Sequence, residues 1–308
     1  MTRPVGFTST AIIPISGDFR NTSFYWNDLY IPVGKGLLAF ERTAYEAALL
    51  GATSIYVVVN NKQYIPIRNR LGNWMYSPAF ARKYLYHKNL LEEGKGHAFP
   101  NLNSLRKRIP IFYIISDFEE EGVNTLLWST LKAMILTTKM FETISAYALP
   151  DKYLVMFPYS ATDLDFLNEV RKTAMSWEGG NIFFERDGKT ILDGELCPFI
   201  IRYNRFVEFV KAYYSSVNKK KKEYESLEKA LKENFYKKIQ FKEVFENIAR
   251  QEDDIFLTPT WSYDITLWEG YRSFLLETKE FPEREEFLSK KEFIPRQTLQ
   301  AMEFLGKK

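Results

Sequence analysis

The sequence predicts an α/β fold built on a mixed, mainly parallel sheet, and three neighbouring segments carry this prediction. Ala11–Ile15 and Ser54–Val59 are apolar or β-branched runs that are typical of buried strands. Between them, residues 37–50 have helical periodicity and end before Gly51, a residue favoured just after a helix. A strand, a helix and a strand in this order form a β–α–β unit, whose two strands run parallel.

The elements that follow extend the same sheet. Further strands are expected at 111–115, 152–157 and 199–202, and helices at 125–146 and 267–276. Residues 182–191 are predicted to form a hairpin that turns at Asp187-Gly188, because Asp-Gly suits a two-residue hairpin loop. We expect one domain over 1–276, with charged helices at 205–250, and a C-terminal helical tail over 277–308.

A basic and aromatic stretch at 62–110 breaks the alternation of strands and helices, and it is predicted to be a long insertion with one helix near 78–93. Basic and aromatic side chains together can contact phosphates or stacked bases, so nucleic acid is a possible partner. The alternative is a solvated lid that packs its rings on the domain. The net charge of +3 is too small to indicate nucleic acid by itself.

Composition excludes several kinds of site. Cys197 is the only cysteine, so an intramolecular disulfide and a cysteine-based zinc site are excluded, and its apolar neighbours indicate a buried thiol. The two histidines, His87 and His97, both lie in the predicted insertion and offer little material for a catalytic triad or a zinc site. Without a signal peptide or an apolar run of ~18 residues, the expected compartment is the cytoplasm, with no membrane partner.

Three segments together resemble the sugar nucleotidyltransferases, also called nucleotide-sugar pyrophosphorylases. They are the loop Ser16-Gly17-Asp18-Phe19-Arg20, the run Pro32–Leu38, and the run Trp261–Tyr271 with its Asp264-Ile265 pair. The resemblance implies a three-layer nucleotide-diphospho-sugar transferase fold, similar to the GT-A fold, with a long insertion and a helical C-terminal region.

The resemblance also implies a set of site residues. Nucleotide binding would fall to Ser16, Gly17, Asp18, Asn124 and Thr125; Arg20 and Lys35 would neutralise phosphate charge; Asp264 and Asp163 would hold Mg²⁺. For each aspartate a helix cap is the alternative, at the helix starting near Leu164 for Asp163 and before 267–276 for Asp264.

Two departures from the family pattern concern catalysis. The catalytic lysine of the family should fall near Asn27-Asp28, where no basic residue stands, so Arg20 or Lys35 would have to replace it. The strand that ends in Gly-Asp in the family ends here in Phe157-Pro158.

Three functions therefore stay open. The first is Mg²⁺-dependent nucleotidyl transfer from a nucleoside triphosphate to a sugar phosphate. The chain would then bind a nucleoside triphosphate or a nucleotide sugar. The second is a non-catalytic relative that binds a nucleotide or a protein partner as a structural module. The third is a glycosyltransferase that uses a nucleotide sugar.

Overall fold

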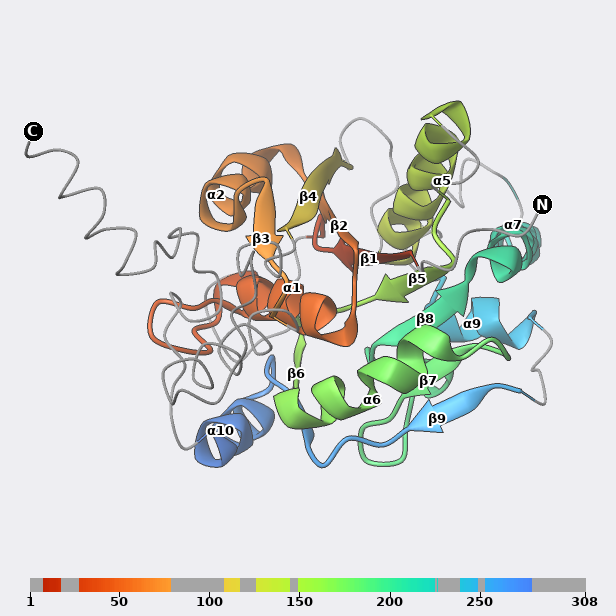
Figure 1. The fold of residues 1–308 in the computed structure, drawn as a ribbon. Coiled ribbons are helices and arrows are strands. Elements are labelled where there is room, and N and C mark those ends of the chain that lie inside the picture. Colours follow the sequence, from red (N-terminus) through yellow and green to blue (C-terminus); the bar gives the residue numbers. More distant parts are fainter. Residues whose placement is uncertain are drawn as a thin grey trace, which may run out of the picture.

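The chain forms one eight-stranded sheet that lies between two layers of helices (Figure 1). The computed structural model describes residues 8–17, 28–78, 108–116, 126–144, 149–224, 226, 239–248 and 253–278. The strand order is β3-β4-β2-β1-β5-β8-β7-β9, and a separate two-stranded sheet joins β10 to β6.

The centre of the sheet is parallel, as the sequence predicts. Its strands are β1 (Ser9–Pro14), β2 (Ser54–Val59), β4 (Arg108–Ile115) and β5 (Lys152–Val155). The first strand pairs in parallel with both β2 and β5, and β2 pairs in parallel with β4. Every residue of β1, β2 and β5 is buried, which explains why their sequences are apolar without alternation.

Antiparallel strands complete the sheet at both edges. They are β3 (Trp74–Tyr76) beside β4, and β8 (Phe199–Arg202) between β5 and β7 (Ile182–Phe184). At the outer edge β9 (Ile255–Leu257) runs parallel to β7. The two-stranded sheet consists of β6 (Ser160–Thr162) and β10 (Ser262–Asp264). The sheet is thus mixed but mainly parallel, and the predicted fold class is confirmed.

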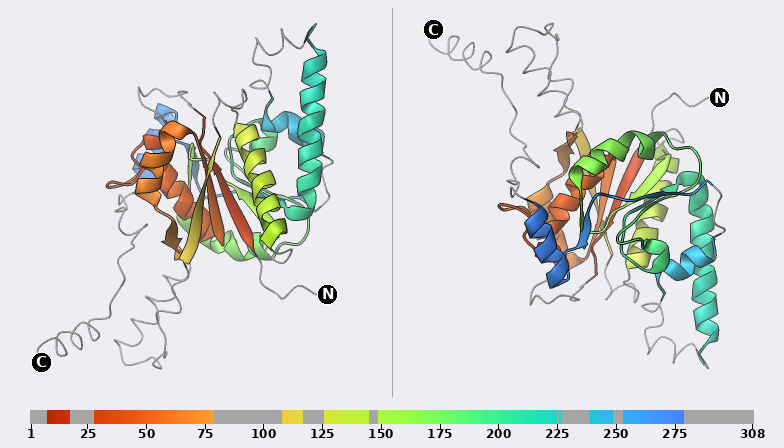
Figure 2. Two further views of the ribbon diagram at one scale, coloured as in Figure 1. Left: turned by 90° about the horizontal axis from the view of Figure 1, so that it is seen from above. Right: turned by 90° about the horizontal axis from the view of Figure 1, so that it is seen from below.

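The helices divide between the two faces of the sheet (Figure 2). Helices α1 (Ala39–Leu50) and α2 (Asn61–Leu71) cover one face, and α6 (Leu164–Ser176) packs beside α1. Helices α5 (Leu126–Ile144), α7 (Phe206–Lys222) and α9 (Phe241–Glu246) cover the other, and α10 (Trp268–Glu277) packs against β10. Within the ranges given above, no helix is both long and apolar enough to cross a membrane.

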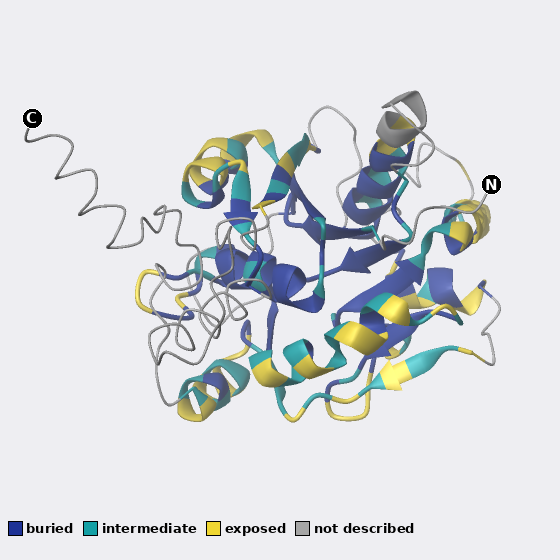
Figure 3. Cartoon of the chain, viewed as in Figure 1, coloured by how far each residue is buried: buried dark blue, intermediate teal, exposed yellow. Residues whose placement is uncertain are grey.

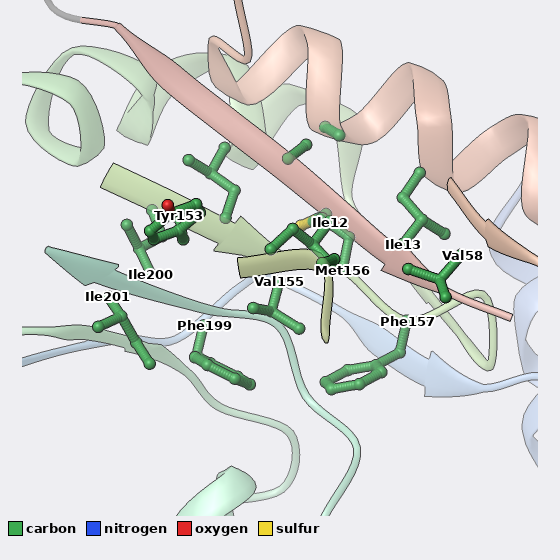
Figure 4. Packing of buried hydrophobic residues seen from close by; sticks show 14 of the residues in the cluster. Ile12, Ile13, Val58, Tyr153, Val155, Met156, Phe157, Phe199, Ile200 and Ile201 are labelled. Carbon is green, nitrogen blue, oxygen red and sulfur yellow. The ribbon is translucent and has the colours of Figure 1, made fainter. Parts of the chain in front are cut away.

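The residues where β5 and β8 meet are buried (Figure 3), and several of them are aromatic. Phe157 and Phe199 are 1% and 0% exposed and lie close to Val155 (Figure 4). The ring of Phe199 also meets those of Phe241 and Phe245 on α9, with centroids 5.6 and 5.4 Å apart. Edge-to-face contacts of this kind stabilise a core beyond the area that they bury. In this part of the chain, the high aromatic content builds the interior.

Helix α2 and strand β3 lie where the sequence predicts the start of an insertion. The side chain of Asn60 accepts from the backbone of Gln63, and this capping box begins α2 in spite of Pro66 in its interior. The arginines of this region that the structure describes make internal contacts: Arg70 pairs with Glu41, and Arg108 lies over the ring of Trp74. A nucleic-acid partner is therefore not supported. The predicted helix near 78–93 and the tail over 277–308 lie essentially outside the described residues.

Candidate functional site

The order of the strands locates a candidate site at one edge of the sheet. The connection through α1 leads from β1 to β2 on one face, and the connection through α5 leads from β4 back to β5 on the other. The strand order therefore reverses between β1 and β5. In open α/β sheets ligands bind outside the carboxyl ends of the strands at such a point. The residues that follow β1 and β5 are therefore the first to consider.

The loop after β1 is held in place by side chains from two neighbouring elements. Ser16 is fully buried, and its hydroxyl lies 2.6 Å from the hydroxyl of Ser129 on α5. The amide of Asn60 donates to the Ser16 carbonyl oxygen at 3.0 Å, and that of Gln63 donates to the Gly17 carbonyl oxygen at 3.4 Å. The capping box of α2 thus also fixes this loop. Of the other residues predicted to bind or neutralise the nucleotide, Asp18, Arg20, Asn124 and Thr125 lie outside the described residues.

The segments Pro32–Leu38 and Trp261–Tyr271, far apart in the sequence, pack together in the structure. The hydroxyl of Tyr271 donates to the carbonyl oxygen of Pro32 at 2.7 Å. A small apolar cluster joins the two segments, in which the described buried residues are Ile31, Val33, Leu37, Ala39, Ala161, Ile265 and Phe274. The resemblance in sequence thus corresponds to one piece of the fold.

Lys35 lies at the exposed tip of this loop. Pro32 and Leu38 pair across its base, and the Val33 amide donates to the Leu37 carbonyl oxygen at 2.9 Å. Arg70 on α2 holds the tip by donating to the carbonyl oxygen of Gly36. Lys35 is therefore at the surface of a tight turn that other residues keep in place.

An acidic residue occupies the part of the chain where the resemblance places the catalytic lysine. Asp28 begins the short 3₁₀ helix η1 (Asp28–Tyr30) and is 1% exposed. Burial, and after it the negative charge of Asp28, raises the pKa of the Tyr159 hydroxyl, which lies just beyond β5. A buried carboxylic acid, rather than a cation, therefore occupies this part of the chain.

The strands β6 and β10 bring Asp264 beside the chain that leaves β5. Asp264 pairs with Ser160, and the amide of Ile265 donates to the carbonyl oxygen of Tyr159 at 3.0 Å. The predicted second metal aspartate therefore lies near the end of β5. Pro158, three residues after β5, stands where the resemblance places the family's aspartate, and it offers no side-chain ligand.

Asp163 directly follows β6 and caps a helix. Its carboxylate accepts from the amide of Asp165 at 3.0 Å at the start of α6, so the alternative interpretation as a cap is confirmed. Its own amide donates to the carbonyl oxygen of Trp261, three positions along the ladder from Asp264. At about 3.4 Å per residue, the backbones of the two aspartates are about 10 Å apart. The structure does not bring them together.

The carboxylate of Asp264 is engaged by its own turn. One oxygen accepts from the amide of Thr266 at 2.9 Å and from its hydroxyl at 2.6 Å. Helix α10 begins against the same residue, because a Cβ atom at Gly270 would lie only 1.9 Å from the Asp264 carbonyl oxygen. Glycine alone fits this approach. Asp264 is thus held rigidly between a strand and a helix.

The turn predicted at Asp187-Gly188 is present, but a single bridge between Arg186 and Lys189 closes it in place of the paired strands predicted over 182–191. This turn brings an arginine to the aspartate. Asp187 and Gly188 have φ angles of 52° and 72°, and Arg186 and Lys189 exchange two backbone hydrogen bonds across the turn. The Arg186 guanidinium lies 3.7 Å from the second carboxylate oxygen of Asp264. Sequence reasoning missed this residue, because only the fold shows which carboxylate it meets.

Arg186 is buried among acidic and polarisable groups. It is 8% exposed, and its Nη2 atom also lies 2.5 Å from the carboxylate of Glu195. Burial lowers the pKa of Arg186, but Cys197, Glu195 and Asp264 together outweigh this effect and raise it. For the Cys197 thiol burial has the opposite effect and raises the pKa to about 11. The thiol is therefore buried and protonated at neutral pH, as the sequence predicts.

Magnesium does not fit the residues of this site that the structure describes. The ion prefers several oxygen ligands in near-octahedral geometry. Here Asp264 is already bonded on one oxygen and faces Arg186 on the other, and Asp163 is turned to a helix end. Across the described ranges, no three His, Cys, Asp or Glu side chains are grouped so that they could hold a metal ion.

Solved structures with this architecture identify the fold. A protein of Bacillus anthracis described as a glucose-1-phosphate thymidylyltransferase aligns with a TM-score of 0.53 at 9% identity, over 91% of this chain and 98% of that one. The UTP-bound UGPase of Acinetobacter baumannii aligns with a TM-score of 0.53 at 11% identity, over 97% and 99%. The chain has the sugar nucleotidyltransferase fold.

A UDP-glucose pyrophosphorylase structure from Acinetobacter baumannii agrees, with a TM-score of 0.51 at 11% identity over 98% of this chain and 99% of that one. No family model matches the sequence, and no curated protein matches it. The sugar nucleotidyltransferase fold is therefore present almost over its full length, in a chain whose sequence has diverged far from these structures.

Proposed function

We propose that this chain binds a nucleoside triphosphate or a nucleotide sugar at the carboxyl edge of its sheet and does not perform Mg²⁺-dependent nucleotidyl transfer. The fold supports the first half of the proposal, since one structure that aligns over nearly the whole chain holds UTP. The anchored loop at Ser16-Gly17 supports it further, because it lies at the reversal of strand order where such sheets bind ligands.

The observation that carries the second half is that no second carboxylate stands beside Asp264 in a group that could hold a metal ion, within the part of the chain that the structure describes. Nucleotidyl transfer depends on positioning and on neutralising the charge that develops around the transferred phosphorus. Pro158 follows β5 where the resemblance places an aspartate, and Asp28 is buried where it places a lysine. Both differences remove positive charge or metal ligands from the place where the reaction requires them.

Isothermal titration calorimetry with UTP, dTTP, ATP, GTP and UDP-glucose tests the binding half. We expect saturable binding of at least one of them, and loss of this binding in Gly17→Leu, whose side chain would fill the loop that contacts the ligand. Ser176→Leu is the control for a leucine introduced away from the site, at an exposed position at the end of α6, beside the amino end of β5. Binding that is absent in the parent chain would leave only the protein-binding module.

An assay of pyrophosphate release from each triphosphate and glucose 1-phosphate, with Mg²⁺ present, tests the catalytic half. We expect no release above the background of the chain-free mixture. Release that Asp264→Asn abolishes would instead establish a transferase. Release of free sugar or transfer from UDP-glucose would favour the glycosyltransferase.

A further inference from the structure

The charge that neutralises Asp264 is part of the chain itself. Arg186 reaches this carboxylate from the hairpin after β7 and binds Glu195 with the same Nη2 atom. The side chains of Asp264 and Glu195 are 29% and 37% exposed, whereas that of Arg186 is only 7% exposed. A buried cation thus lies beneath two carboxylates that face the outside.

This arrangement opposes a divalent cation at the same place. A metal bound to the free oxygen of Asp264 would lie within a few ångströms of the guanidinium, and two positive charges that close repel strongly in a partly buried site. The other oxygen already accepts two hydrogen bonds from Thr266. Arginine keeps its charge at any physiological pH, so the repulsion does not disappear on titration.

The Nη1 atom of Arg186 adds a second observation. It is buried and has no hydrogen-bond acceptor among the described residues. A buried donor without an acceptor costs about 1–3 kcal/mol. Because this atom is covered, a ligand oxygen would reach it once the partly exposed carboxylate of Glu195 or Asp264 turned aside. Guanidinium groups bind phosphate oxygens well, because their donors form a planar fork.

We propose that Arg186 takes the place of a metal ion in this site. It neutralises Asp264 and Glu195 through Nη2, and its Nη1 donates to a phosphate oxygen of the ligand once one of these carboxylates has turned aside, so ligand binding at this edge does not require Mg²⁺. The contact with the ligand rests on the proposed function. The exclusion of the metal from Asp264 does not.

A titration with Mn²⁺ alone, followed by electron paramagnetic resonance of the free ion, tests the exclusion without any nucleotide. We expect no Mn²⁺ that depends on Asp264 in the parent chain, and one additional bound ion in the double variant Pro158→Asp/Arg186→Gln, which supplies a second carboxylate and removes the guanidinium. An ion bound by the parent chain and lost in Asp264→Asn would overturn the proposal.

Calorimetry with the nucleotide that binds tests the contact. The affinity of the parent chain should agree within about twofold in Mg²⁺ and in EDTA, and it should fall about tenfold in Arg186→Gln, which corresponds to one lost charged hydrogen bond. The affinity of Arg186→Lys, which keeps the charge but not the planar fork of donors, should lie between those of the parent chain and Arg186→Gln.

Arg205→Gln is the matched control, because Arg205 is also 9% exposed, pairs with Glu208 and has buried nitrogen atoms without a partner among the described residues. It lies after β8, away from the carboxyl edge of β5. An unchanged affinity in Arg186→Gln, or an equal fall in Arg205→Gln, would contradict the contact. Absence of any nucleotide binding would instead contradict the proposed function, and the Mn²⁺ titration would still decide the exclusion.

Discussion

Two buried arginines contact the β6–β10 sheet, and they differ in how completely their hydrogen bonds are satisfied. Arg42 on α1 is 2% exposed; its Nε donates to Glu46 at 2.8 Å and its Nη2 to the carbonyl oxygen of Thr162 at 2.8 Å. Its guanidinium also lies 5.2 Å from the ring centre of Phe274. Every partner of this arginine that is named here is itself buried.

Arg186 contacts the same small sheet from the carboxyl edge, and its environment is less complete. Both of its carboxylate partners are partly exposed, and its Nη1 atom has no acceptor among the described residues. Burial of an arginine alone therefore does not mark a ligand-binding site. A saturated buried ion pair specifies how elements pack, whereas a buried charge with exposed partners and a spare donor can still exchange a partner for a ligand.

The largest effect is expected for Arg42→Met. The substitution leaves Glu46 without its cation in the core, and breaking a buried pair from one side costs about 3–5 kcal/mol. Burial raises the pKa of Glu46, although Arg42 opposes this. A carboxyl with a raised pKa stabilises the fold at low pH and loses that contribution as the pH rises, so the deficit of the variant should shrink toward about pH 4. Urea unfolding at several pH values measures both.

The double variant Arg42→Met/Glu46→Leu serves as the control. Replacing both charges by apolar groups of similar size should restore most of the lost free energy of unfolding. A single variant as stable as the parent chain, or a deficit that grows on acidification, would show that Glu46 does not depend on Arg42.

A smaller effect is expected for Arg186→Met. Water can hydrate Asp264 and Glu195 once the guanidinium is gone, since both carboxylates are partly exposed. We therefore expect a loss of about 1–2 kcal/mol in the free energy of unfolding, from the same urea experiment. A loss equal to that of Arg42→Met would show that the two arginines contribute equally to the stability of the fold, contrary to this expectation.

The smallest effect is expected for Asp163→Ala, which removes the cap of α6. Loss of an N-cap costs about 1 kcal/mol, and Asp163→Ser should retain most of the stability because serine also caps. Nucleotide affinity should be the same in both variants, measured by calorimetry. A loss of nucleotide affinity in both the alanine and the serine variant, with stability retained in the serine variant, would indicate that Asp163 belongs to the binding site.

Local patterns predicted the parallel half of the fold well, because each of its strands and helices has a recognisable sequence pattern within a few consecutive residues. Strand β2 lies at the predicted residues, and α1 ends at Gly51, whose φ angle is 115°. Helix α2 was missed because Pro66 interrupts its pattern, although the Asn60–Gln63 capping box was present in the sequence.

The candidate site was harder to predict, because its contacts join residues far apart in the chain. Strands β6 and β10 have three residues each and pair across about one hundred positions, which no local pattern signals. The resemblance singled out Asp264 as a metal ligand, and this role stays a prediction; the structure has the residue on β10, paired with Ser160. The arginine that meets it comes from a hairpin whose turn was predicted but whose partner depends on the whole fold.

The close approach at Gly270 has a mechanical consequence. The backbone of α10 abuts the carbonyl oxygen of Asp264, and the next residue, Tyr271, is tied to Pro32. A side chain at position 270 would push α10 away from β10 and strain the hydrogen bond between Tyr271 and Pro32. The start of α10, Asp264 and the segment at Pro32 are therefore joined by direct contacts, and a side chain at position 270 would disturb all three.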